Sequence, residues 1–313
     1  MFEQEIIDNY RKIWKIWTGL VKSRYAAFKY SPKLTRLLDQ INGKPTGFII
    51  GSGISTVSKP FWSMWDEHKD RLNKISENPK DIPGFVDLFE SGAIKYHPDK
   101  GISAIPDLVQ TGVAPLFLVF NYNCHIELCL SICGIGYRSI SYNGPSRNEQ
   151  FIVRTPKCTI LKPHGTSRLT GLPTSIVWPE KKPRKNYSIL DEFVELVGKM
   201  KIDQIVILAW SGNFDPHLKS YLLSLKNDLD VRFIHVDRYR TSFQENRTYN
   251  WRVVKKKDLI QYLDDGAKDF LIGMLKHKIK DKEPCTAVSD PLSKIQEFHT
   301  KYKHRIEELI VSE

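Results

Sequence analysis

The feature that most constrains the fold is a short apolar run that breaks into glycines, residues 47–55, Gly-Phe-Ile-Ile-Gly-Ser-Gly-Ile-Ser. An unbroken apolar run of this kind is typical of a buried parallel strand. Such a strand releases its chain through a tight turn. Glycines there let backbone N–H groups approach an anionic ligand, and the next helix offers its positive N-terminus to the same charge. We therefore predict a strand that feeds a phosphate-binding turn, with a plain strand-to-helix connection as the alternative.

Further apolar runs predict that this strand is one of several. We expect the other strands at 116–120, 159–162, 204–210 and 231–236, and helices at 127–133, 188–200 and 216–225. The stretch 134–150, which is rich in Gly, Ser, Asn and Pro, predicts loop or edge-strand structure. Strands that alternate with helices favour an α/β fold with a doubly wound parallel (Rossmann-like) sheet.

Both ends of the chain have helical patterns, so we divide it into three parts. Residues 1–45 form an N-terminal helical extension, in which apolar residues at helical spacing predict one long amphipathic helix up to about residue 40. Residues 46–245 hold the sheet, with several short helices inserted before residue 112, and residues 246–313 form a C-terminal helical segment. We expect helix from residue 258 onward, interrupted near Pro284 and Pro291.

Composition limits the partners and the compartment. The 47 Lys and Arg against 36 Asp and Glu give a net charge of +11, which favours an anionic partner, although a basic surface without a specific partner is the alternative. The densest basic runs are 181–185, 255–257 and 276–282. Five cysteines without paired Cys-x-x-Cys spacing argue against a zinc ribbon, and we expect no metal. No apolar run is long enough to cross a bilayer, so we expect no membrane contact and a cytoplasmic location.

Polar residues follow the predicted strands where a doubly wound sheet binds ligands, beyond the carboxyl ends. The candidates are Gly51, Ser52, Gly53 and Ser55 after the first strand, Asn121 and Asn123 after the second, His164 after the third, Ser211 after the fourth and Asp237 after the fifth. A carboxylate in the place of Asp237 commonly accepts from ribose hydroxyls, with a surface ion pair or a cap as the alternative.

Taken in order, these segments resemble those of the sirtuin-like family of NAD-consuming proteins. The turn 51–55 is similar to the family's Gly-Ala-Gly-x-Ser pyrophosphate turn, and 120–123 with Glu127 is similar to its Thr-Asn-Tyr-Asp…Glu signature. The segment 162–166 resembles the one that carries the catalytic histidine, and 208–216 resembles the Gly-Tyr-Ser…Asp-Pro block, with Ala209 in the place of its glycine. The resemblance covers about residues 46–240 and implies that the sheet domain binds NAD.

The resemblance also implies a chemistry. This chain lacks the four-cysteine zinc module of the deacylating branch, so it is similar to the zinc-free branch found in prokaryotic antiphage defence, which hydrolyses NAD to ADP-ribose and nicotinamide. We expect Asn121 to position ribose or water and His164 to act as general base, with a structural histidine at a turn as the alternative. Asn123, where the family usually has Asp, is the candidate for the nicotinamide carboxamide.

Two functions follow as hypotheses. The first is an NAD-depleting immune effector, held silent until a protein partner such as an Argonaute-like protein or an ATPase senses nucleic acid. The second is a catalytically inactive sirtuin-like subunit that assembles with a nucleic-acid-binding partner. Direct nucleic-acid contact through the basic runs and a homo-oligomer are further expectations.

Overall fold

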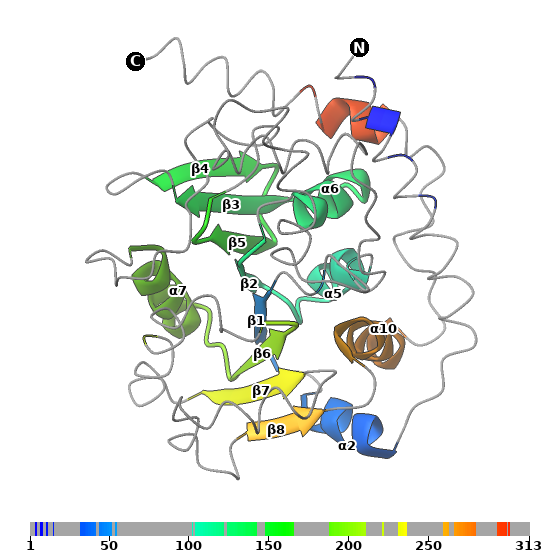
Figure 1. Ribbon diagram of the computed structural model, residues 1–313, viewed down its shortest axis with the longest axis vertical. Coiled ribbons are helices and arrows are strands. Elements are labelled where there is room, and N and C mark those ends of the chain that lie inside the picture. Colours follow the sequence, from blue (N-terminus) through cyan, green and yellow to red (C-terminus); the bar gives the residue numbers. More distant parts are fainter. Residues whose placement is uncertain are drawn as a thin grey trace, which may run out of the picture.

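The centre of the molecule is an eight-stranded sheet (Figure 1). The computed structural model describes residues 32–41, 44–51, 54, 102, 104–121, 124–142, 148–165, 188–210, 221, 231–236, 259–262, 266–279, 293–298 and 300, with positions 4, 7, 8, 11 and 15 near the N-terminus. The strands are β1 (Thr46–Ile50), β2 (Leu116–Val119), β3 (Tyr137–Tyr142), β4 (Asn148–Val153), β5 (Cys158–Lys162), β6 (Gln204–Leu208), β7 (Arg232–Val236) and β8 (Leu259–Tyr262). They lie in the order β4-β3-β5-β2-β1-β6-β7-β8, and only the β3–β4 pair is antiparallel. The predicted doubly wound parallel sheet is confirmed.

Helices cover both faces of this sheet. They are α2 (Pro32–Ile41), α5 (Ile105–Gln110), α6 (His125–Ile132), α7 (Ser188–Lys199) and α10 (Gly266–Ile279). In Figure 1, α7 lies on one side of the sheet, and α5, α6 and α10 lie on the other. The buried apolar side chains accordingly form two clusters, one on the α7 face and one on the α5, α6 and α10 face.

The central strands are buried on both faces, which explains their unbroken apolar sequences. Along β1, Ile49 faces the α7 cluster, while Phe48 and Ile50 face the opposite cluster. Phe48 stacks on Phe117 of β2 with ring centroids 5.5 Å apart. Each such ring contributes about 2–3 kcal/mol through burial, so the paired strands hold the middle of the sheet together.

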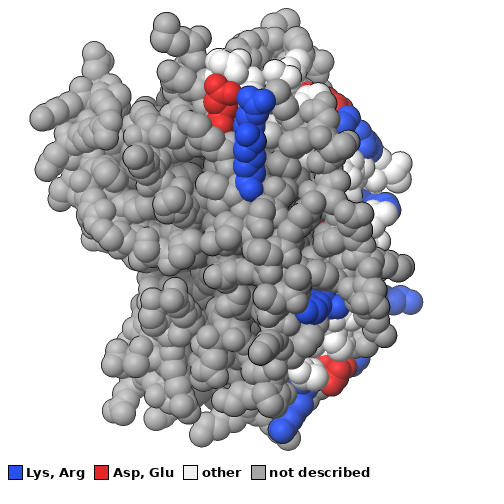
Figure 2. All heavy atoms as spheres, turned by 90° about the vertical axis from the view of Figure 1, so that its right-hand side faces the viewer, with Lys and Arg blue, Asp and Glu red and all other residues white. Residues whose placement is uncertain are grey.

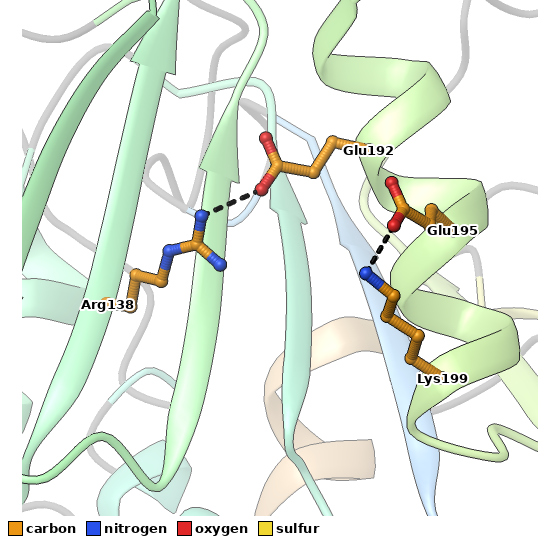
Figure 3. A network of polar contacts seen from close by, with 4 residues as sticks. All are labelled: Arg138, Glu192, Glu195 and Lys199. Carbon is orange, nitrogen blue, oxygen red and sulfur yellow. Dashed lines mark hydrogen bonds and ion pairs between the residues drawn. The ribbon is translucent and has the colours of Figure 1, made fainter.

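A polar contact at the rim also joins α7 to the sheet (Figure 3). Arg138 of β3 donates from an Nη atom to Glu192 of α7 across 3.0 Å, and both side chains are partly exposed. On the same helix, Lys199 pairs with Glu195 one turn earlier and lowers the pKa of that carboxyl. Contacts this exposed add little stability, so the apolar face of α7 is what fixes the helix.

Two strands correct the sequence predictions. The stretch 134–150, predicted as loop or edge strand, leads into the edge strand β4, but it also contains β3, which lies inside the sheet between β4 and β5. In the C-terminal segment predicted to be helical, β8 extends the sheet beside β7, so Val236 does not end the last strand. β3 pairs with β4 and β5, and β8 pairs with β7, and in both strands this pairing within the sheet outweighs local preference.

Only part of the predicted N-terminal helix lies within the described residues. The helix α2 that precedes β1 begins at Pro32, and proline is tolerated in the first turn of a helix. The described positions 4, 7, 8, 11 and 15 are helical, as expected. Most of the predicted inserted helices and of 216–225 lie outside the described residues, but α5 falls within the predicted region.

Candidate active site

The strand order places the predicted site at a topological switch point. From β1 the chain moves first to one side, to β2 and β5, and later to the other side, to β6. In doubly wound sheets the ligand crevice opens at such a point, outside the carboxyl ends of the strands. The described residues that follow these four strands include Gly51, Phe120, Asn121, His164 and Trp210.

Three aromatic rings connect these strand ends. Phe120 stacks on Trp210 with centroids 4.6 Å apart and planes 7° apart. The same Phe120 ring lies against the imidazole of His164, with centroids 5.4 Å apart and planes inclined by 58°. Phe120 therefore touches the ends of both β5 and β6, and it directly precedes Asn121.

The two predicted catalytic residues are both buried at neighbouring strand ends. Asn121 is 5% exposed and follows β2, and His164 is 6% exposed and follows β5, the hydrogen-bonded neighbour of β2. His164 sits in a turn in which the Gly165 N–H donates to the carbonyl of Lys162 over 3.1 Å, and Gly165 has φ +77°. This geometry brings an amide and an imidazole to one water-poor edge of the sheet.

Gly51 is required by the protein's own packing. A Cβ atom at this position would lie 2.3 Å from the carbonyl oxygen of Ala209 and 2.5 Å from the Cα atom of Trp210. The Gly51 N–H also donates to the carbonyl of Leu208 over 2.9 Å. At Gly51 the structure shows a close backbone approach between the ends of β1 and β6, and the contact of this glycine with an anionic ligand stays a prediction.

Ala209 turns the chain as it leaves β6. Its φ is +51°, a left-handed conformation that is uncommon for a residue with a side chain. Strand alternation would point Trp210 to the same face as Leu208, yet Trp210 belongs to the α7 cluster while Leu208 and Ala209 pack with the opposite cluster. The positive φ therefore places the indole where it meets Phe120.

A buried polar network under the site was not predicted. Lys162, the last residue of β5, is fully buried, and its Nζ atom lies 3.3 Å from Oε1 of Glu127 in α6. Ser139 of β3 donates its hydroxyl to the same oxygen over 3.3 Å. Two features of the sequence could have predicted this ion pair: a lysine at the end of an apolar strand and a glutamate inside an apolar helix. Charged residues in such buried elements are usually paired with one another.

Burial shifts the pKa values of neighbouring groups on α6 and β5. Desolvation, with a smaller contribution from the Lys162 charge, lowers the pKa of His125 to about 3, so this imidazole is neutral at physiological pH. Burial raises the pKa of the Cys129 and Cys158 thiols, and Glu127 adds to both shifts. These cysteines are therefore poor nucleophiles, and His125 is a neutral core residue.

Six predicted ligand-binding residues lie outside the described residues: Ser52, Gly53, Ser55, Asn123, Ser211 and Asp237. Their assignments stay predictions. The strands that precede them end at Ile50, Val119, Leu208 and Val236, within two residues of the predicted ends.

Within the described ranges, no three His, Cys, Asp or Glu side chains gather as a metal site would require. None of the helices in that part of the chain is long and apolar enough to cross a bilayer.

Of the three basic runs in the sequence, 181–185 and 255–257 lie outside the described residues. From the third run, Lys276 and Lys278 lie in the last turn of α10. Figure 2 shows described basic side chains at separate places on one face, some beside acidic ones.

Comparison with known proteins finds similarity in structure but not in sequence. No family model and no curated protein sequence matches the chain. Among solved structures, a Sir2 homologue in complex with NAD is 17% identical with a TM-score of 0.44, over 78% of this chain and 93% of that one. A mutant Sir2 homologue bound to ADP-ribose is 13% identical with a TM-score of 0.43, over 77% and 95%. Sir2Tm bound to a propionylated peptide is 14% identical with a TM-score of 0.41, over 76% and 95%. At this level of similarity, no site residue or activity carries over from those proteins.

Proposed function

We propose that the protein is a sirtuin-like NAD+ hydrolase that cleaves NAD+ to ADP-ribose and nicotinamide. The observation that carries this proposal is the contact between Phe120 and His164, because it joins the strand end that bears Asn121 to the one that bears the histidine. Both polar side chains are at least nine-tenths buried, at the edge of the sheet where dinucleotides bind in this fold class.

The chemistry of the bond explains why these two groups suffice. Cleavage of the nicotinamide–ribose bond passes through a ribose with oxocarbenium character, so holding the sugar and a water molecule in place supplies much of the catalysis. In our proposal the Asn121 amide holds the ribose or the attacking water, and the His164 imidazole accepts a proton from that water. Water adds to the sugar carbon, and nicotinamide leaves with the bonding electron pair.

In the cell, we propose that this activity depletes NAD+ as an immune effector in complex with a protein that senses nucleic acid. The resemblance in the sequence motifs supports this role, and the net charge of +11 suits a partner that carries nucleic acid.

The test is NAD+ consumption by the purified full chain, alone and with the protein encoded beside it, for the wild type and for Asn121→Asp, His164→Gln and the double variant. Each single substitution should lower kcat at least about 100-fold, and the double variant should lose little more, because groups that act in one step give non-additive losses. His277→Gln is the matched control, since this partly buried histidine of α10 pairs with Asp39 of α2 and neither residue follows a strand of the site, and it should retain full activity.

A His164→Gln protein that hydrolyses NAD+ like the wild type would refute the assignment of the base. Binding of NAD+ without cleavage under every condition would favour the inactive assembly subunit instead.

A further inference from the structure

The indole N–H of Trp210 is a buried donor at the site. Trp210 is 6% exposed, and among the described residues its Nε1 atom has no hydrogen-bond partner. Indole nitrogen donates and cannot accept, so only an acceptor atom satisfies it. Buried polar atoms are nearly always paired in folded proteins, and each exception calls for an explanation. A ligand that brings an acceptor is such an explanation.

The position of the indole identifies where that ligand lies. The Cα atom of Trp210 packs directly on Gly51, where β1 ends and the chain enters its turn, so the residue flanks the switch point between β1 and β6. Its ring stacks on Phe120, which also touches His164. The unpaired donor therefore belongs to the same cluster of strand ends as the two proposed catalytic residues.

The backbone is arranged to put the indole there. Ala209 adopts φ +51°, and this reversal carries Trp210 to the face on which Phe120 lies. Conformations of this kind persist only where the surrounding structure compensates for them, and they are concentrated at functional sites.

We propose that Trp210 Nε1 donates a hydrogen bond to a pyrophosphate oxygen of the bound dinucleotide. The inference rests on the proposed function, because it takes the ligand to be NAD+ or ADP-ribose. In doubly wound sheets the pyrophosphate lies at the first strand-to-helix turn, next to the switch point that Trp210 flanks. An anionic oxygen is also the strongest acceptor that such a ligand offers, and it binds a neutral N–H donor more tightly than a carbonyl does.

The experiment measures ADP-ribose binding by calorimetry to the full-length wild type and to Trp210→Phe, which keeps a ring against Phe120 but removes the N–H group. We expect the Kd of the variant to rise about ten-fold, as for the loss of one hydrogen bond to a charged acceptor. Phe233→Leu is the control. Phe233 belongs to the same apolar cluster but lies near the start of β7, at the opposite end of the strands, so its Kd should stay at the wild-type value.

Nuclear magnetic resonance of ¹⁵N-labelled tryptophan observes the bond directly. The Trp210 indole signal, identified by its absence in Trp210→Phe, should move downfield with ADP-ribose and stay in place with nicotinamide alone. An unchanged Kd in Trp210→Phe, or an indole signal that responds only to nicotinamide, overturns the inference and leaves NAD+ hydrolysis standing. If the folded wild type binds neither NAD+ nor ADP-ribose, both proposals fail together.

Discussion

Lys162 and Glu127 form an ion pair almost completely removed from solvent, with side chains 0% and 3% exposed and Nζ 3.3 Å from Oε1. The pair ties the end of β5 to α6, two residues before His164. Removing one member of a buried pair leaves the other charge buried without a partner, whereas replacing both charges by neutral groups is often tolerated.

We therefore expect Lys162→Met to lower the free energy of unfolding by about 3–5 kcal/mol. The double variant Lys162→Met, Glu127→Gln should recover at least half of this loss, because the amide oxygen of Gln can still accept from Ser139. Urea unfolding of the wild type, both single variants and the double variant measures the coupling. Losses that simply add would show that the two charges are independent.

His125 gives the stability of the protein a defined dependence on pH. Its pKa is lowered to about 3 by burial, whereas the unfolded chain binds a proton with a pKa near 6.5. Between these values the unfolded state holds more protons, so stability is fully present above about pH 6.5 and falls with decreasing pH, by about 1.4 kcal/mol per unit well below 6.5.

The substitution His125→Gln removes the contribution of this imidazole to the pH dependence of stability. A plot of its unfolding free energy against pH should match the slope of the wild type near pH 7.5 and become shallower than the wild type by the same amount per unit well below pH 6.5, whatever other groups titrate. Parallel plots down to pH 4.5 would mean that the imidazole binds its proton equally well in the native and the unfolded state.

Two glycine-to-alanine substitutions should change stability in opposite directions. Gly51→Ala places a Cβ atom 2.3 Å from a backbone oxygen that cannot move aside, so we expect a loss of about 2–3 kcal/mol or more. Gly198 lies in α7 with nothing within 4 Å of the added atom, so Gly198→Ala should raise stability by about 0.5–1 kcal/mol. Thermal unfolding measures the change in melting temperature of each variant relative to the wild type. Equal changes in the two variants would contradict the close approach of the β6 end to Gly51.

Ala209→Gly should be an exception to the usual cost of glycine. In the native state, glycine avoids the cost of about 1–2 kcal/mol that alanine pays for its left-handed conformation. Glycine also gives the unfolded chain more conformational freedom, which lowers stability by about 0.4–1 kcal/mol, so we expect a net gain in the free energy of unfolding of up to about 1 kcal/mol. Ala104→Gly, at a buried residue with φ −83°, should instead lower stability by about 1 kcal/mol. Urea unfolding of the two variants and the wild type measures these changes as shifts of the unfolding midpoint. An equal loss of stability in both variants would rule out relief of strain at Ala209.

Much of the sheet could be predicted from the sequence because its central strands are buried on both faces and read as unbroken apolar runs. β3 could not, since Tyr-Arg-Ser-Ile-Ser-Tyr is half polar and becomes a strand by pairing with β5 and β4. β8 is only four residues long, and a short apolar run does not distinguish strand from helix.

At the site, the adjacency of Asn121 and His164 could be predicted because each follows a strand of one parallel sheet. The contacts that join them could not. The stacking of Phe120 on Trp210 depends on the strand order and on the positive φ of Ala209. A positive φ cannot be predicted from an alanine in the sequence.

The helix α10 has a consequence for the newly made chain. Its residues Phe270, Leu271, Met274 and Leu275 belong to the apolar cluster that contains Phe48 and Ile50 of β1, and β8 just before it forms the edge of the sheet. A ribosome that has reached residue 210 has thus already synthesised every described residue of the strand-end site, while the cover for the central strand is still to be made. Folding of this sheet is therefore completed late in translation, and the nascent chain until then carries an open apolar face of the kind that chaperones bind.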